Sequence, residues 1–200
     1  MRNAGERMEL SAKVIRVITI APIMALLLMT SLYLSDAALL GGLPQYLASI
    51  FFLAVLPVLA YPLQSFIPLF KRDKRSGQRK LAFITSVVGY LCGIIFATAT
   101  NAPMIVHVIY WTYFLSVTLL TAFNSFTPWK ASGHACGVCG PVVTMVYFIG
   151  PQALTALLIY VALFWASLKM KRHTVTELIL GGLDSVFAFA IVLLMTREML

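Results

Sequence analysis

Apolar residues along this 200-residue chain gather in seven long runs, which short polar, proline-containing or glycine-containing segments separate. A helix needs about 20 apolar residues to cross the hydrocarbon core of a bilayer. The runs therefore predict a bundle of about seven transmembrane helices, with the fifth and sixth runs divided by the pair Gly150 and Pro151. The predicted helices cover residues 17–35, 46–70, 81–100, 104–123, 134–149, 152–167 and 174–195.

Prolines in the second run predict an irregular helix there, because a proline inside a helix removes a backbone donor and clashes with the preceding turn. These prolines are Pro57, Pro62 and Pro68. We find neither an internal repeat nor a low-complexity linker. The sequence thus predicts one integral membrane domain over residues 1–200, with a cytoplasmic N-terminal segment at 1–16 and a helix bundle at 17–195.

Composition supports the membrane assignment, since 60% of the residues are hydrophobic and only 11% are charged. A soluble domain carries about 25% charged residues. The net charge of +8 resides in loops and at the N-terminus, without an aromatic-studded basic face. We therefore expect membrane lipids as the partners of these cations and no nucleic acid.

The distribution of lysine and arginine predicts the topology. If the N-terminus is cytoplasmic and seven helices cross the membrane, only Arg197 of the fifteen cations falls outside the cell. We expect a multi-pass protein of the cell membrane whose histidine-bearing loops face the cytoplasm. The fourteen cytoplasmic cations are Arg2, Arg7, Lys13, Arg16, Lys71, Arg72, Lys74, Arg75, Arg79, Lys80, Lys130, Lys169, Lys171 and Arg172.

The first candidate for chemistry is the pattern His173-x3-Glu177-x3-Gly181, which opens the last predicted helix. Residues four apart share one face of a helix. The Glu177 carboxylate can then accept a hydrogen bond from one imidazole nitrogen and leave the other free to attack an electrophile. A glycine one turn further on lets a neighbouring backbone approach closely. An ordinary interfacial His/Glu pair near a helix start would give the same spacing.

The second candidate is the segment from Lys130 to His134, before the fifth predicted helix. Ser132 and the amides of Gly133 and His134 can receive phosphate oxygens, because the N-terminus of a helix favours anions. Lys130 can neutralise charge, and His134 can protonate a leaving alcohol. These groups need neither a metal nor a cofactor, so we expect none.

These residues are similar to the motifs of the type 2 phosphatidic acid phosphatase superfamily of membrane lipid phosphatases. That family has a Lys/Arg first motif, a Pro-Ser-Gly-His second motif and a Ser-Arg-x5-His-x3-Asp-x3-Gly third motif. Here Ala131 stands in place of the proline, and Glu177 in place of the aspartate. The resemblance covers residues 130–184. It implies a six-helix phosphatase core, to which this chain adds an N-terminal helix.

The resemblance also implies roles for particular residues. His173 would be the nucleophile that forms a phosphohistidine, Glu177 its orienter and His134 the general acid, while Ser132 and Gly133 would bind phosphate. The third-motif arginine falls at Ser167, and the chain has no Arg-Pro pair of the first motif. Lys130 is the candidate for the first-motif lysine, and Lys169, Lys171 or Arg172 would have to reach the phosphate.

The expected function is hydrolysis of a lipid phosphate monoester or diphosphate: phosphatidic acid, phosphatidylglycerol phosphate or an isoprenyl phosphate. One alternative is a catalytically impaired relative, because two arginines of the pattern are absent. Another is a transporter or channel that uses His107 and Asp184, since an acid within an apolar run marks a functional site by default. A third is a soft-metal site at His134, Cys136 and Cys139, although small residues at these positions more simply permit close helix contact.

Overall fold

The computed structural model describes residues 4–67 and 74–197, and this part of the chain is helical without strands. The predicted all-α class is therefore confirmed. Five helices of the described residues are long and apolar enough to cross a membrane, or six if the bent pair of α1 and α2 counts as one span. They indicate a multi-pass integral membrane protein. The helices are α1 (Ala4–Ile18), α2 (Ala21–Ser35), α3 (Leu43–Ile50), α4 (Leu56–Leu63), α6 (Lys74–Ala99), α7 (Met104–Phe126), α8 (Gly133–Ile149), α9 (Leu157–Lys169) and α10 (Val175–Thr196).

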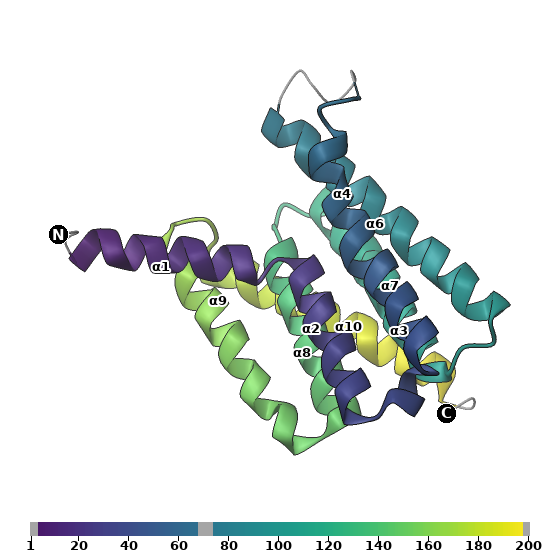
Figure 1. The fold of residues 1–200 in the computed structure, drawn as a ribbon. Helices are drawn as coiled ribbons and strands as arrows, with labels where there is room; N and C mark the ends of the chain where they lie inside the picture. The colour runs from purple at the N-terminus through teal and green to yellow at the C-terminus, as the bar shows by residue number, and fades with distance from the viewer. Residues whose placement is uncertain (1–3, 68–73, 198–200) are drawn as a thin grey trace.

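The start of the chain differs from the prediction of one helix over residues 17–35. α1 ends at Ile18 and α2 begins at Ala21, with a bend of 61° between them. Pro22 lies in the first turn of α2, where its missing N–H costs nothing, but its ring prevents the helix from continuing backwards. α1 therefore leaves the direction of α2 and lies against α9 (Figure 1).

The second predicted helix, 46–70, is an irregular span over Leu43–Leu63. α3 and α4 are joined by a π-helical turn, Phe51–Val55, in which the Leu56 N–H donates to the Phe51 carbonyl. The wider turn accommodates Pro57, whose ring would clash with the carbonyl four residues earlier in α-helical geometry. The predicted irregularity is thus a π turn, while Pro68 and the end of this predicted helix at residue 70 lie outside the described residues.

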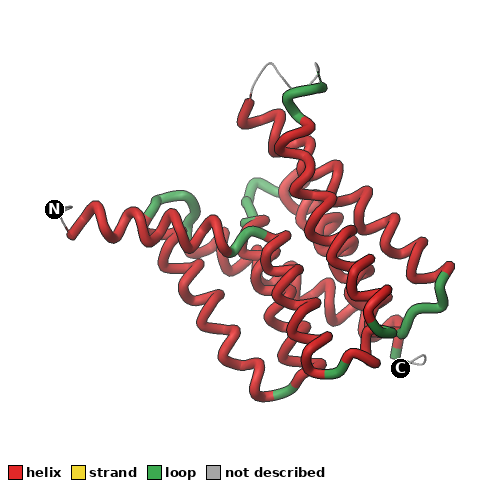
Figure 2. Tube along the Cα trace, viewed as in Figure 1, coloured by secondary structure: helices red, strands yellow, loops and turns green. Residues whose placement is uncertain are grey.

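Helix packing brings the histidine-bearing segments to one end of the bundle. α10 packs mainly against α7 and α8, and α8 also packs against α2. The α1–α2 junction, the α7–α8 loop and the α9–α10 loop lie at the same end, whereas the end of α10 lies near the other (Figures 1 and 2). The two histidine-bearing segments therefore lie at one end of the bundle.

Candidate active site

The backbone between α9 and α10 fixes the position of His173. Lys171 adopts φ 50°, and the Arg172 and Lys171 amides each donate a 3.0 Å hydrogen bond to the carbonyls of Ser167 and Leu168, respectively. This is the Schellman arrangement that ends many helices. Thr174 then caps α10 by accepting a 3.2 Å hydrogen bond from the Glu177 amide. His173 is held between these two caps.

The predicted pairing of His173 with Glu177 is present. Nδ1 of His173 lies 2.7 Å from Oε2 of Glu177, and the two side chains are 26% and 28% exposed. An ionised carboxylate only accepts, so Nδ1 carries the shared hydrogen and Nε2 presents its lone pair. Among residues 4–67 and 74–197, Nε2 has no hydrogen-bond partner. The ring is therefore oriented, with one nitrogen open.

The start of α8 presents two unpaired amides. Ser132 is the N-cap, and its hydroxyl accepts a 3.3 Å hydrogen bond from the Ala135 amide. The amides of Gly133 and His134, the first two residues of the helix, have no acceptor in the described part of the chain. Free N–H groups at a helix N-terminus favour an anion. This end of α8 can thus bind phosphate oxygens as the sequence predicts.

Gly181 joins the two motifs. A Cβ atom at this position would lie 2.2 Å from the carbonyl oxygen of Ser132, so only glycine lets α10 approach the start of α8 this closely. The Ser132 amide donates a 2.8 Å hydrogen bond to the Glu177 carbonyl across the same contact. The predicted close backbone approach at Gly181 is confirmed, and the neighbour is Ser132.

His134 makes a contact that the sequence did not predict. Its Nε2 lies 3.0 Å from Oγ1 of Thr19, a residue that is 3% exposed at the α1–α2 bend. Thr19 donates to the Ile15 carbonyl at 2.7 Å, so its hydroxyl accepts from Nε2–H. This contact places His134 beside the bend between α1 and α2, near the Arg16 guanidinium.

A polar pocket lies where these segments meet. We use this name for the depression lined by Arg16, Phe83, Leu120, Thr121, Asn124, Ser125, Ala131, Gly133, His134, Arg172 and His173. Two arginines and two histidines contribute to the lining, whereas no carboxylate does. A concave site lined by arginines and histidines attracts anions. The electrostatics of the pocket therefore suit a phosphate group.

Three predicted phosphate-binding residues do not line this pocket. The Lys130 ammonium donates to the Asn124 carbonyl at 3.1 Å, and Lys169 is exposed in the last turn of α9. Ser132 is only 1% exposed, and its hydroxyl serves the cap. Gly133 and Arg172 do line the pocket. Arg16 also lines the pocket, although it was not among the predicted phosphate-binding residues.

Asn124 fixes the loop that leads into α8. Its Oδ1 accepts a 2.7 Å hydrogen bond from the Ala131 amide, and its Nδ2 donates to the Ala131 carbonyl at 3.1 Å. The two bonds form a ring between one side chain and one residue of backbone. The loop before Ser132 is therefore held in place by the end of α7.

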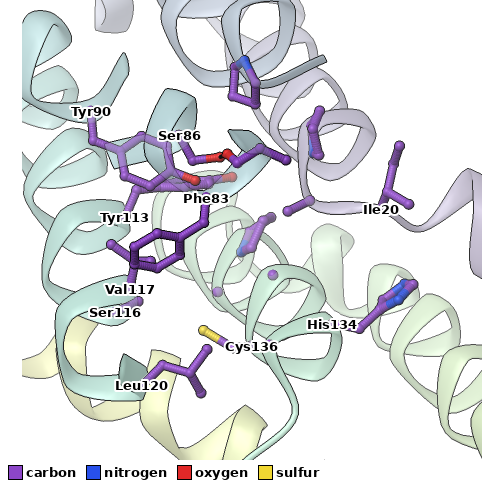
Figure 3. Close-up of a pocket in the computed structure, with 18 of the residues that line it drawn as sticks. Ile20, Phe83, Ser86, Tyr90, Tyr113, Ser116, Val117, Leu120, His134 and Cys136 are labelled. Carbon is purple, nitrogen blue, oxygen red and sulfur yellow. Dashed lines mark hydrogen bonds between the residues drawn. The ribbon is translucent and has the colours of Figure 1, made fainter. Parts of the chain in front are cut away.

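An apolar cavity of about 390 Å³ adjoins the polar pocket. Phe83, Leu120, Gly133 and His134 border both spaces. Figure 3 shows the His134 ring at one side of the cavity, with Tyr90 and Tyr113 at the other. The hydroxyls of Thr112 and Tyr113 are buried without a hydrogen-bond partner in the described structure. The cavity thus offers an apolar wall with two unused hydroxyls, next to a cationic pocket.

The residues of the transporter and metal alternatives are dispersed. Asp184 accepts a 3.4 Å hydrogen bond from the Cys136 thiol within the bundle. His107 lies in the first turn of α7, near the opposite end, and its side chain makes no hydrogen bond with a described residue. Within the described ranges, no group of three or more histidine, cysteine or acidic residues is arranged to hold a metal ion.

Comparisons with known protein families, with curated proteins and with solved structures found no match for this chain.

Proposed function

We propose that this protein is a metal-independent lipid phosphate phosphatase of the type 2 phosphatidic acid phosphatase kind, acting through a phosphohistidine at His173. The observation that carries the proposal is the junction at Gly181, which brings the oriented imidazole of His173 and the N-terminus of α8 into one cationic pocket. The motif resemblance over residues 130–184 supports the same assignment.

In the first step, Nε2 of His173 attacks the phosphorus of the substrate. The bond between phosphorus and the lipid oxygen breaks, and His134 donates a proton to the departing alcohol. The negative charge of the phosphate beside His134 favours the protonated form of the imidazole, which is the form that acts as the acid. Glu177 stabilises the positive charge that develops on the His173 ring.

In the second step, water attacks the phosphorus of the phosphohistidine. His134, now neutral, accepts a proton from this water, the phosphorus–nitrogen bond breaks and inorganic phosphate leaves. The amides of Gly133 and His134 together with Arg172 stabilise the charge on the equatorial oxygens in both steps. His173 returns to its starting form, so the cycle needs no external reductant, oxidant or metal.

The apolar cavity supports a lipid as the substrate. Its volume of about 390 Å³ lies in the range of roughly 300–1,000 Å³ that is typical of small-molecule sites. A hydrocarbon chain in the cavity would place its phosphate in the polar pocket, because His134 and Gly133 border both spaces. Phosphatidic acid, phosphatidylglycerol phosphate and isoprenyl phosphates all have this combination of tail and headgroup.

The proposed assembly has seven spans, a six-helix core and an additional N-terminal helix, with the active site toward the cytoplasm of the cell membrane. Its sidedness is tested by Ser76→Cys in a background in which the exposed Cys92 is replaced by alanine. We expect a membrane-impermeant maleimide to label Asn101→Cys, but not Ser76→Cys, in intact cells. Labelling of Ser76→Cys from outside would reverse the proposed orientation.

The activity is tested with protein purified in detergent and assayed for phosphate release from the three lipid classes, without metal and with a chelator. We expect release that persists in chelator and is abolished by His173→Ala and His134→Ala. Release that survives both substitutions would contradict the mechanism, and complete loss in chelator would favour a metal enzyme. If no substrate releases phosphate, the proposed function is wrong.

A further inference from the structure

The last turn of α1 brings Arg16 into the polar pocket. Ala12 and Arg16 on α1 share the side of the helix that is turned inward, and Thr19 continues the same spacing just after the helix ends. Ala12 is 0% and Thr19 3% exposed, whereas Lys13 on the adjacent face is exposed. The small side chain of Ala12 lets α1 lie against α9. Arg16 is itself partly buried on this side of α1 and does not simply extend into solvent.

A buried serine of α9 orients the Arg16 guanidinium. Nη1 of Arg16 donates a 2.6 Å hydrogen bond to Oγ of Ser167, which is 0% exposed. A guanidinium has five N–H donors, and the described residues provide no other hydrogen bond and no carboxylate for it. Arg172 lies near enough to repel it. Arg16 lies beside a second cation and has most of its N–H donors unused, and this arrangement favours binding of an anionic ligand.

We infer that Arg16 is the phosphate clamp of the active site and that Ser167 is the residue that positions it. The remaining guanidinium donors bind two oxygens of the substrate phosphate in the forked geometry that arginine makes with phosphate. This inference rests on the proposed phosphatase function for the identity of the ligand. It also accounts for the departure at position 167, where the resembling third motif has arginine: the guanidinium reaches the same region from α1 and bonds the serine that occupies that position.

The competing explanation is that Arg16 is an ordinary interfacial cation that attracts lipid headgroups. Lys13→Ala is the matched control, because it removes an equal charge from the same helix at an exposed position. Removal of one donor to a transition-state oxyanion costs about 10²–10³ in kcat. We therefore expect Arg16→Ala to lower kcat/KM by about 100-fold and Lys13→Ala to change it less than threefold.

Placing an arginine on α9 tests whether position 167 lies within reach of the substrate phosphate. The double substitution Arg16→Ala with Ser167→Arg creates room on α1 and supplies a guanidinium from α9. We expect it to recover at least tenfold of the activity lost in Arg16→Ala. If Arg16→Ala fails to fold, Arg16→Gln replaces it, because glutamine keeps much of the length and can still donate to Ser167. Arg16→Ala or Arg16→Gln with at least one-third of the wild-type kcat/KM would overturn the inference.

Binding of inorganic phosphate separates this inference from the proposed function. A ligand that binds only the folded protein raises its Tm, so the test compares Tm in phosphate with Tm in chloride at equal ionic strength. We expect phosphate to stabilise the wild type and Lys13→Ala, and the midpoint phosphate concentration to rise at least tenfold in Arg16→Gln. An unchanged midpoint in Arg16→Gln would refute the clamp even if His173-dependent hydrolysis is found. A wild type that binds phosphate through Arg16 but releases none from any lipid would retain the clamp and refute the phosphatase.

Discussion

Replacement of Gly181 by alanine tests whether the junction of α8 and α10 assembles the active site. The added Cβ would lie 2.2 Å from the Ser132 carbonyl oxygen and 3.0 Å from the Ser132 backbone nitrogen and carbonyl carbon. Because Cβ atoms do not approach other atoms closer than 3.0 Å, the oxygen contact must lengthen by roughly 1 Å. The obstacle is backbone, so no side-chain rotation relieves it. The start of α8, which carries His134, must move away from His173.

A displacement of about 1 Å between catalytic groups can reduce the rate by about 100-fold. Overpacking of this kind also costs about 1–3 kcal/mol of stability. We therefore expect Gly181→Ala to lower kcat/KM on the preferred lipid phosphate about 100-fold and to reduce the Tm of the purified protein. Both quantities can be measured on one preparation, by phosphate release and by thermal unfolding monitored by intrinsic fluorescence.

The neighbouring Gly182 provides the control. A Cβ at this position would lie 2.3 Å from the hydroxyl of Tyr160, the far end of a side chain that can turn aside. Gly182→Ala should reduce Tm as well, but it leaves the Ser132 contact intact and should retain most of the activity. The reasoning fails if Gly181→Ala keeps wild-type kcat/KM, or if Gly182→Ala loses as much activity at equal stability.

Three further substitutions examine individual contacts. Glu177→Gln keeps the shape of the side chain but loses the charge that stabilises the His173 imidazolium, so kcat should fall at least 100-fold. The rate of phosphoenzyme formation, measured by rapid quench, should fall by the same factor. An unchanged rate of phosphorylation would argue against an orienting role for Glu177. Thr19→Val removes the acceptor of the His134 Nε2–H bond, and loss of one hydrogen bond of about 1 kcal/mol should lower kcat roughly fivefold. An unaltered kcat would show that this hydrogen bond does not contribute to catalysis. Tyr113→Phe removes an unpaired hydroxyl of the apolar cavity. The value of kcat/KM should fall about fivefold for an acyl-ester lipid and should stay unchanged for an isoprenyl phosphate, which has no ester carbonyl. Equal effects on both substrates would show that the hydroxyl does not bind the ester.

Local spacing made part of this site predictable from the sequence. The bond between His173 and Glu177 was expected from their four-residue spacing at the start of a predicted helix, and the free amides of Gly133 and His134 were expected from the helix predicted to begin at residue 134. The close approach at Gly181 was predictable as a property of glycine, although its partner, Ser132, was not. Features within one turn of helix depend little on the remainder of the fold, which explains why they could be inferred.

Contacts between distant segments could not be inferred in the same way. Arg16 and Ser167 are 151 residues apart, and a cation beside an apolar run is normally explained by membrane topology. The available signal was Pro22, which ends a helix before α2 and so leaves residues 4–18 as a separate element. The spacing of Ala12 and Arg16 on that element, continued by Thr19 just after its end, would then have indicated its inward face. The π turn before Pro57 likewise depends on how one helix absorbs a proline, which the pattern of apolar residues does not encode.

The hydrogen-bonded ring between Asn124 and Ala131 has a consequence for consensus engineering. Replacing a residue by the one most frequent among similar proteins usually stabilises, and the resembling second motif has proline where this chain has Ala131. Proline has no amide hydrogen, so the substitution would delete the 2.7 Å bond to Asn124 Oδ1. Positions 124 and 131 therefore have to be substituted together. A proline at position 131 is compatible with this loop only when the side chain at position 124 does not need a hydrogen bond from the amide of residue 131.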